Sequence, residues 1–431
     1  MKERLKTIVL TVLVVSSLVQ SFFLIYRLPG NDSAVQSPNA YIRTEEMGTE
    51  EKAENLLYPD KMIVHMGESK HTIFYPNDTF YNLIYTRLKG RTFDSFQRRM
   101  VTNMDWEKLR SESQGIELSF DSGVPVRLLQ RVMQIRPDST FEGESINRMW
   151  LYSVEGEPKI HVLFFSTKGD AVYEAGQADL TPQDVQQLVD FGQNWMSYTL
   201  TDGGYYLPGT DMDMIRVDMP LDMYTIEQMQ RSLFFDPSIT RNIRERDGSQ
   251  IYTDSKRSLQ VDHAQSWISY TDPAAPPSGE SNPGKDVLSA IDFVNQHGGW
   301  NGIFRLSRAD ESEDRTQVGF QQYYGGYPIL NTRAFPFGVM ELDLQQGTVT
   351  SYERSLLYLQ DEPLAKQVVK LPGGEKLAAS LEELVGEASM ASIASIDPAY
   401  VPESLDDGVR LKPVWAVRLE NGSIRTVAAV E

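Results

Sequence analysis

Residues 7–26 read TIVLTVLVVSSLVQSFFLIY, a run of twenty residues without a formal charge near the start of a chain of 431. About 20 helical residues span about 30 Å, the thickness of the hydrocarbon core of a bilayer. A secretory signal has a shorter apolar run and a small-x-small cleavage site, whereas this run continues into Arg27 without an Ala-x-Ala motif, and the chain has no cysteine for lipid attachment. The sequence therefore predicts an uncleaved transmembrane anchor, with residues 1–28 forming a cytoplasmic tip and the membrane helix.

The charges beside the anchor predict its orientation. Lys2, Arg4 and Lys6 precede it and are opposed only by Glu3. Because positive flanks stay in the cytoplasm, we expect a single-pass protein of the cell membrane with a cytoplasmic N-terminus and an extracytoplasmic bulk. With Arg27, residues 1–30 carry +3, which leaves −22 for the rest of a chain whose net charge is −19. This acidity argues against nucleic acid as a partner.

The composition is typical of a folded bacterial envelope protein. Hydrophobic residues make up 41% of the chain and aromatic residues 10%, which is enough for packed cores. The absence of cysteine means that no disulfide forms. Such usage is unusual for secreted eukaryotic domains but common in envelopes without oxidative folding.

Segment composition predicts the domain organisation. Residues 29–58 are rich in Gly, Ser, Asn and charged residues, which is typical of a polar tether. The rest is too long for one core, so we expect about three α+β domains with antiparallel sheets and separate helices. The predicted domains cover residues 59–204, 205–357 and 358–431.

Local signals place several elements in the first domain. Residues 61–66 are expected to form a strand, and residues 161–165 and 171–173 a hairpin. A helix is expected from Asn77 or Asp78 to Lys89, with one apolar face made of Phe80, Leu83, Ile84 and Leu88. A second helix, opened by Thr181-Pro182, is expected to carry Val185, Leu188, Val189 and Trp195.

The next region has similar signals. Thr225 and Gln228 have the spacing of a capping box, and residues 242–252 have two strand-like runs about an Asp-Gly turn. Residues 272–284 are expected to form a loop, after which Asp286 caps a helix that ends before Gly298.

The last 150 residues or so contain a weak internal repeat. Residues 339–349 (VMELDLQQGTV) and residues 414–424 (VWAVRLENGSI) match in type at a constant offset of 75. Each segment follows an amphipathic helix, so the pattern predicts duplicated helix-plus-hairpin modules. Any two hairpins with a glycine turn could also align in this way.

Motifs for catalysis or cofactors are weak or missing. Residues 279–286 (GESNPGKD) nearly match a phosphate-binding loop, but Asp286 replaces the hydroxyl that would hold magnesium. The five histidines form no HExxH motif; His65 and His71 could meet a carboxylate on zinc, although surface positions fit them better. No G-x-S-x-G or S-x-x-K motif occurs. We therefore expect no catalytic residue, cofactor or metal.

Two alternatives stay open. The chain has 60 carboxylates, so a glycosidase-type pair that forms only in space is conceivable. The aromatic residues of 323–328 (YYGGYP) would suit sugar stacking on an exposed flat face, or packing within a strand and turn. A membrane-anchored cell-wall hydrolase and a carbohydrate- or peptide-binding envelope module are the corresponding alternative functions.

The anchor has one face suited to partner helices. At 100° per residue, five residues fall within about a third of the circumference: Thr7, Thr11, Val14, Ser17 and Ser21. Two of their pairs have the small-xxx-small spacing that allows close helix approach in lipid. Serine and threonine are also simply tolerated in spanning helices.

Residues 233–259 (LFFDPSITRNIRERDGSQIYTDSKRSL) resemble the YycH (WalH) family. The likeness includes the short N-terminal anchor, residues 206–208 (YLP) and residues 411–415 (LKPVW), and it covers essentially the whole chain. Residues 234–253 are its most specific part.

The resemblance implies a non-enzymatic regulator of the WalK–WalR (YycG–YycF) two-component system of low-GC Gram-positive bacteria, which controls cell-wall hydrolase genes. It implies a partner, the single-pass protein YycI, and contact with the sensor histidine kinase partly through transmembrane helices. It also implies three α+β domains, with a C-terminal part that is similar to YycI, and no catalytic residues. Whether the chain activates or inhibits the kinase does not follow from it.

Overall fold

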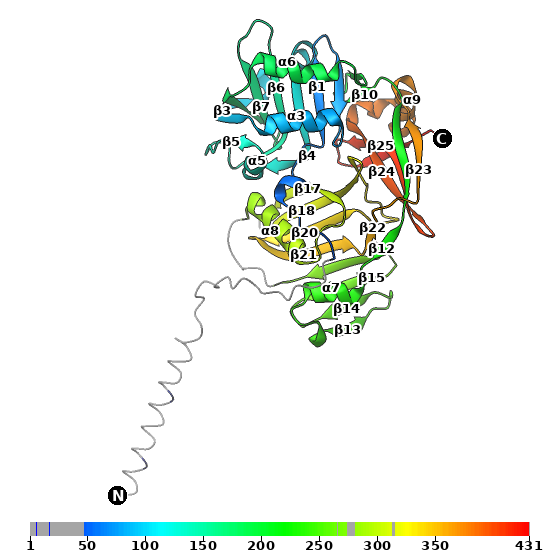
Figure 1. The fold of residues 1–431 in the computed structure, drawn as a ribbon. Coiled ribbons are helices and arrows are strands. Elements are labelled where there is room, and N and C mark those ends of the chain that lie inside the picture. The colour runs from blue at the N-terminus through cyan, green and yellow to red at the C-terminus, as the bar shows by residue number, and fades with distance from the viewer. Residues whose placement is uncertain are drawn as a thin grey trace. The chain divides into compact units, whose positions relative to one another are not determined.

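The structure is a computed structural model that describes Lys6, Ser17 and residues 47–264, 266–273, 281–312 and 315–430. The chain separates into two compact units, Met1–Glu45 and Glu46–Glu431. Every strand and helix named below lies in the second unit, which contains sheets with helices packed on them (Figure 1); their strands pair antiparallel except for one parallel pair, between residues 92–93 and 134–135. The predicted α+β class is confirmed.

A ten-stranded sheet forms the first part of this unit. Its strands lie in the order β10-β9-β2-β1-β4-β6-β7-β8-β3-β5. Their bounds are β1 Lys61–Met66, β2 His71–Phe74, β3 Thr92–Met100, β4 Gln114–Pro125, β5 Gln134–Ile135, β6 Ser145–Ser153, β7 Ile160–Ser166, β8 Ala171–Ala178, β9 Tyr198–Leu200 and β10 Tyr206–Pro208.

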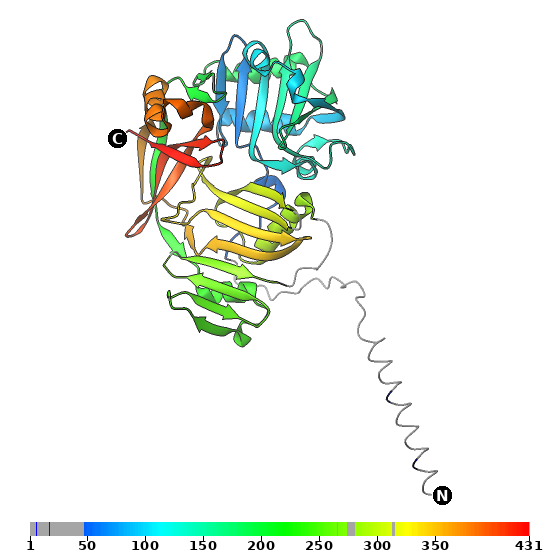
Figure 2. The same ribbon diagram turned by 180° about the vertical axis from the view of Figure 1, so that it is seen from behind.

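The two faces of this sheet differ because side chains alternate along each strand. Met62 and Val64 of β1 and Leu118 of β4 point into the main core, which α3 (Thr79–Lys89), α5 (Val126–Val132) and α6 (Pro182–Val189) help to bury. The opposite face carries the short helix α4 (Trp106–Glu112), packed beside Trp150, and at Lys61 it meets the five-stranded sheet described below. We call this side the open face; it is turned toward the viewer in Figure 2, which shows the molecule of Figure 1 from behind.

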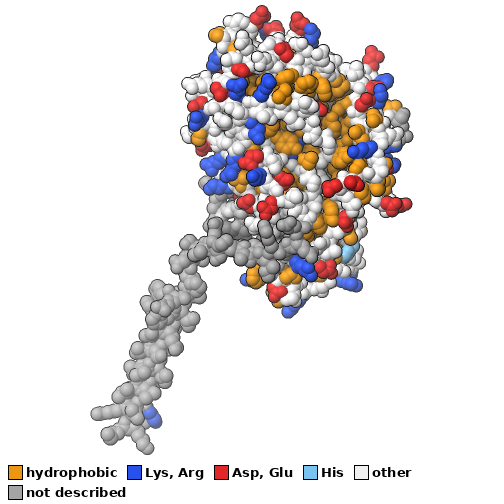
Figure 3. Space-filling model, in the orientation of Figure 1, with side chains coloured by type: hydrophobic (Ala, Val, Ile, Leu, Met, Phe, Trp, Pro, Cys, Tyr) orange, Lys and Arg blue, Asp and Glu red, His pale blue; other side chains and the backbone are white. Residues whose placement is uncertain are grey.

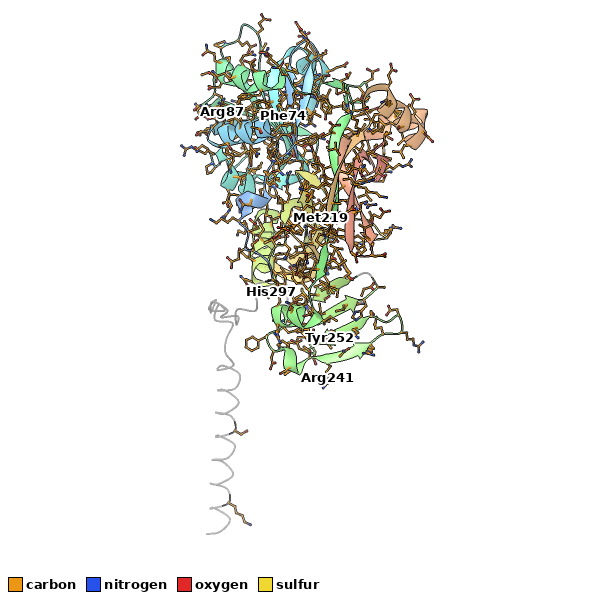
Figure 4. All side chains as sticks on the ribbon, turned by 45° about the vertical axis from the view of Figure 1, so that its right-hand side comes forward. Phe74, Arg87, Met219, Arg241, Tyr252 and His297 are labelled. Carbon is orange, nitrogen blue, oxygen red and sulfur yellow. The ribbon has the colours of Figure 1, made fainter. Side chains whose placement is uncertain are left out.

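A nine-stranded sheet follows, in the order β13-β14-β15-β16-β21-β20-β18-β17, with β19 paired to β18. Its strands are β13 Arg241–Arg244, β14 Gln250–Thr253, β15 Ser258–Asp262, β16 Trp267–Thr271, β17 Ile303–Ser312, β18 Arg315–Tyr324, β19 Tyr327–Pro328, β20 Val339–Gln345 and β21 Thr348–Ser355. Helices α7 (Ile226–Leu233) and α8 (Pro283–Gln296) contribute to the same core, as does α2 (Ala53–Leu56). Arg241 and Tyr252 lie at the far end of this sheet from Met219 (Figure 4).

A five-stranded sheet completes the unit, in the order β23-β11-β25-β24, with β26 paired to β25. Its strands are β11 Met212–Met219, β23 Ala365–Leu371, β24 Ile393–Leu405, β25 Gly408–Leu419 and β26 Ile424–Ala428. Helix α9 (Gly374–Val385) packs on it through Leu377 and Leu381. A two-stranded sheet pairs β12 (Leu221–Met223) with β22 (Leu357–Leu359), and short 3-10 turns connect other elements at Val101–Asn103, Asp190–Gly192, Pro237–Ile239 and Glu387–Ser392.

Strand β11 joins segments that are far apart in the sequence. It pairs with β23 and with β25, so residues 212–219 belong to the sheet that residues 365–428 otherwise build. The predicted domain boundaries at 204/205 and 357/358 stay a prediction.

Most local predictions are confirmed. The strand at 61–66, the hairpin of β7 and β8 and the hairpin of β13 and β14 form as expected. The capping box of Thr225 and Gln228 opens α7, and Thr181 opens α6. Each depends on short-range hydrogen bonds that a few neighbouring residues specify.

Three predicted details are wrong. Asp286 does not cap α8; the helix begins at Pro283, and the side chain of Asn282 accepts the N–H of Lys285 at 3.1 Å. Asparagine before proline is itself a favoured helix start. Helix α6 ends at Val189, so Trp195 lies beyond it, where its ring meets Phe74 at 5.4 Å.

The third detail is the buried face of α3. Leu83 is exposed, whereas the buried residues include two tyrosines, Tyr81 and Tyr85. Their hydroxyl groups donate to the carbonyl oxygens of Pro59 and Leu57. Tyrosine can be buried when its hydroxyl has such a partner. A pattern of apolar residues alone does not predict which tyrosines are buried.

Candidate functional site: a charged junction of three sheets

The predicted partner face of the anchor falls almost entirely on residues outside the described part. Ser17 is described, and it is helical and exposed. Thr7, Thr11, Val14 and Ser21 lie outside the described residues. Within the described residues, the structure has no helix of sufficient length and apolar character to span a membrane.

The first residues of the described compact unit are fastened to the nine-stranded sheet. Thr49 and Trp300 exchange two backbone hydrogen bonds of 2.9 Å. The carbonyl oxygen of Met47 accepts hydrogen bonds of 2.8 Å from Tyr224 and from Asn301. Trp300 is 1% exposed, so the exposed Thr49 is fastened to a buried residue just before β17 of the sheet.

Residues 58–61 then run between the sheets, and the guanidinium group of Arg305 is buried against them. Arg305 comes from β17 and is 1% exposed. Its charged group lies between the rings of Tyr58 and Tyr323, at 3.6 and 4.1 Å from their centroids. It also donates to the carbonyl oxygen of Pro59 at 3.2 Å and lies 3.6 Å from the carboxylate of Asp60.

The same segment connects to the five-stranded sheet. Lys61 lies 2.5 Å from Asp397 of β24, and both side chains are largely buried. Burial alone would lower the pKa of Lys61, but the nearby carboxylates of Asp397 and Asp121 outweigh burial and raise it. Asp121 of β4 also lies 3.3 Å from Arg418 of β25. We call these groups the charged junction, because residues of three sheets contribute to it. Its members are Tyr58, Asp60, Lys61, Asp121, Arg305, Tyr323, Asp397 and Arg418.

A second polar cluster lies on the open face of the ten-stranded sheet. His65 and His71 approach through their Nδ1 atoms at 3.1 Å, and Nε2 of His65 lies 3.5 Å from Glu117. A proton on Nδ1 of His71 leaves Nε2 of His65 to carry the hydrogen that faces this carboxylate. The opposite tautomers would set a lone pair against Glu117. Burial lowers the pKa of both histidines, that of His71 to about 4.

These lowered pKa values predict a loss of stability in acid. The pKa of His71 is about 6.5 in the unfolded chain and about 4 in the folded chain. Between these two pH values, His71 is protonated in the unfolded state and stays neutral in the folded state. The contribution of His71 to the free energy of unfolding is therefore fully present above about pH 6.5 and is lost as the pH falls toward 4. His71→Gln should reduce this loss by about 2–3 kcal/mol, measured as denaturant midpoints at pH 7.5 and 4.5.

The matched control is His263→Gln, because His263 is exposed. It should leave the pH dependence unchanged. Equal acid sensitivity in the unaltered chain and the His71→Gln variant would contradict the assignment.

Of the residues singled out for chemistry, His65 and His71 do meet a carboxylate, that of Glu117, and both are buried, so the surface positions expected for them are wrong. The described residues contain no group of three His, Cys, Asp or Glu side chains suited to a metal ion. His161 pairs with Glu174 at 2.9 Å, and His297 is buried against the carbonyl oxygen of Ser232. Asp286 is buried and accepts hydrogen bonds from Ser281 and Thr316, which leaves it unsuited to phosphate.

The tyrosines of residues 323–328 do not form an exposed flat face. Tyr323 donates to Asp60 at 2.9 Å within the charged junction. The ring of Tyr324 meets Tyr400 at 5.8 Å, and the ring of Tyr327 meets Tyr75 at 5.6 Å. They pack between the sheets, as the strand-and-turn interpretation expects.

Sequence reasoning missed the charged junction because its members are up to about 360 residues apart, from Tyr58 to Arg418. One signal was present: Arg305 stands inside the apolar strand run IFRL of residues 303–306. An arginine on the buried side of a strand requires a partner, so this position marks a buried ion pair without naming the other residue.

The fold and its junction define a class: a strand-rich α+β protein whose sheets meet at a junction of paired charges. Two family models match the chain, "YycH protein, N-terminal domain" over residues 3–197 and "YycH protein, C-terminal domain" over residues 203–429. The chain belongs to the YycH family, which confirms the resemblance found in the sequence.

Two relatives agree with this assignment. The chain is 21% identical over 446 residues to "Two-component system WalR/WalK regulatory protein YycH" of Bacillus subtilis, covering 98% of this chain and 96% of that protein. The crystal structure of YycH from Bacillus subtilis matches with a TM-score of 0.70 at 19% identity, over 88% of this chain and 98% of that one. Family membership makes the chain a regulatory protein and not an enzyme.

Proposed function

We propose that this chain regulates a WalK-type sensor histidine kinase of the WalR/WalK two-component system. The observation that carries the proposal is the full-length likeness to a curated regulator of that system, which covers 98% of the chain. The two family models support it because together they match the chain from residue 3 to residue 429.

The proposed mechanism acts through the membrane. Residues 7–26 serve as the anchor, the N-terminus lies in the cytoplasm, and the compact unit lies outside the cell. The support comes from the uncharged run of twenty residues and from its positive N-terminal flank. A helix in the bilayer changes a kinase only through contacts that differ between the kinase's on and off states. The Thr/Ser face of the anchor supplies such contacts in this proposal.

The compact unit pairs with a YycI-like single-pass protein in the same proposal. In this proposal the compact unit presents a fixed surface to the partner, because its first residues are fastened by the Thr49–Trp300 contact. Acidic and basic side chains are interspersed over the face drawn in Figure 3, so a partner for that face would need complementary charges of both signs.

Duplicated modules belong to the proposal as well. Both repeat segments form hairpins, β20 with β21 and β25 with β26, and Gly347 and Gly422 have φ of 79° and 80° at the two turns. The hairpins follow α8 and α9 respectively. The glycine at each turn supports an origin by duplication, although two residues connect β20 to β21 and four connect β25 to β26.

Ser17→Leu with Ser21→Leu tests the anchor face. The larger side chains should prevent close helix approach and remove hydroxyl hydrogen bonds in lipid, each worth about 0.6–2 kcal/mol. We expect roughly tenfold less kinase to co-purify from detergent-solubilised membranes and a changed output of the kinase regulon.

The matched control is Val15→Leu with Val19→Leu, which has the same spacing on the opposite side of an ideal helix. It should leave recovery unchanged. If the serine variant retains normal kinase recovery and normal output, this face does not bind the kinase.

A further inference from the structure

A cavity of 470 Å³ lies between the open face of the ten-stranded sheet and the five-stranded sheet. The first sheet and its helix α4 contribute Lys61, Arg110, Glu117 and Arg148, and the second sheet contributes Arg418. Gly204 at its rim is exposed, so the cavity is reached from solvent. Neither the charged junction nor the anchor accounts for it.

The floor of this cavity holds an excess of positive charge. Arg110 and Arg148 share a single carboxylate, that of Glu117, at 3.7 and 3.4 Å. Both separations are longer than a good hydrogen bond of about 2.7–3.2 Å. Nε of Arg110 is buried without a hydrogen-bond partner, whereas the Arg148 side chain is 30% exposed and can also donate to water. Such an excess is costly in a largely buried position and favours a bound anion.

The other charges around the cavity are already balanced. Lys61 is paired with Asp397 at 2.5 Å, and Arg418 with Asp121 at 3.3 Å. His65 and His71 carry no charge at neutral pH because burial lowers their pKa. The unbalanced charge therefore resides on Arg110 and Arg148, in a chain whose net charge is −19.

Several buried polar atoms at this floor have no hydrogen-bond partner. They are Nε of Arg110, Oε2 of Glu117, Oδ1 of Asn147 and the hydroxyl of Tyr206, and all four residues line the cavity. Tyr206 is 8% exposed. Folded proteins rarely leave such atoms unpaired, and this set offers a donor, acceptors and a hydroxyl at one place.

The space around these groups suits an extended ligand. A second cavity of 200 Å³ is also lined by Arg110, Asn147 and Arg148, together with Trp106 and Phe165. The charged floor is thus reached from two sides. Ile63, Ile73 and Ile396 line the larger cavity and provide an apolar wall. A simple inorganic anion would use neither the apolar wall nor the second cavity.

We propose that this cavity binds the terminal carboxylate of a short peptide with small apolar side chains. The carboxylate accepts hydrogen bonds from Arg110 and Arg148 and neutralises their excess charge, the geometry in which arginine binds carboxylates best. The last backbone N–H donates to Oδ1 of Asn147, and the side chains pack against Ile63 and Ile73. Because both sheets form the walls, the bound peptide stabilises their association.

The test uses the purified full chain and N-acetyl-Ala-Ala, compared with the same dipeptide as its C-terminal amide. Titration calorimetry should show saturable binding of the acid and at least about tenfold weaker binding of the amide, since a charge-assisted hydrogen bond contributes that much or more. Arg148→Gln should weaken binding of the acid by at least about tenfold, and Asn147→Ala by several fold.

Arg98→Gln is the matched control, because Arg98 forms an exposed ion pair with Asp170 on the same sheet. It removes the same charge and should leave affinity unchanged. Asn147→Ala and the acid–amide comparison keep the test decisive if Arg148→Gln fails to fold.

Any of the following results would overturn the proposal: no binding of the acid up to about 10 mM, equal affinity for acid and amide, or unchanged affinity in the folded Asn147→Ala and Arg148→Gln variants. Inorganic phosphate is titrated in parallel. Phosphate binding as tight as that of the peptide would also overturn it, by reducing the site to one for simple anions.

Discussion

Arg305→Ala is expected to weaken the association of the ten-stranded sheet with the nine-stranded sheet by about 3 kcal/mol of free energy. The guanidinium group is held between two tyrosine rings, and a desolvated cation–π contact is worth about 2 kcal/mol. Its removal also takes the positive partner from Asp60, whose side chain is 19% exposed, and leaves a cavity between Tyr58 and Tyr323. Removing one member of a buried pair costs more than the pair contributes, because the other charge stays behind.

Hydrogen exchange of the purified full chain measures this effect locally. Amides in residues 58–66 and 303–324 should exchange at least about a hundredfold faster in Arg305→Ala, while those in β25 keep their protection. Arg308→Ala is the control on the same strand, since Arg308 forms an exposed pair with Asp310. Exposed pairs contribute at most about 1 kcal/mol. Unchanged exchange at residues 58–66 in Arg305→Ala would show that the charged junction does not hold the sheets together.

Trp415→Ala is expected to destabilise the five-stranded sheet by about 4 kcal/mol. Trp415 lies on β25, between β11 and β24, and its side chain is 0% exposed. Its Nε1–H donates to the carbonyl oxygen of Pro372 at 2.8 Å. Alanine would leave a large cavity beside Leu377 and Leu381 of α9 and an unsatisfied buried carbonyl oxygen.

Denaturant unfolding followed by far-ultraviolet circular dichroism measures this loss, with hydrogen exchange reporting which sheet opens. Trp415→Phe separates the two causes, because it keeps most of the packing and removes only the hydrogen bond. Ile424→Ala is the control on the neighbouring strand, since Ile424 is 41% exposed, and it should cost under about 1 kcal/mol. A Trp415→Ala variant as stable as Ile424→Ala would contradict this account of the core.

The sequence predicts the parts of this fold that depend on neighbouring residues. The capping box of Thr225 and Gln228, the β7–β8 hairpin and the strand at 61–66 all follow from local hydrogen bonding and alternation. Asn282-Pro283 also has the right residues for the start of α8, whereas the acidic Asp286 further along is a misleading capping signal. That aspartate is instead buried within the helix.

Long-range pairing was out of reach. Nothing near Met212–Met219 indicates that β11 pairs with β23, about 150 residues later. The charged junction likewise combines Lys61 with Asp397, which are 336 residues apart. Such contacts depend on how whole sheets stack, so a single sequence supplies only hints, such as an arginine within an apolar strand. Partner recognition is equally hard to predict from a single sequence, because the anchor face rests on residue spacing alone.

The central claim, that this chain regulates a WalK-type kinase by direct association, is tested most directly by crosslinking in intact cells followed by affinity purification of the full chain from membranes. The account predicts that the sensor kinase and a YycI-like single-pass protein are recovered together with it. Recovery of the correctly localised chain without the kinase, under conditions in which the kinase is present in the same membranes, would contradict it.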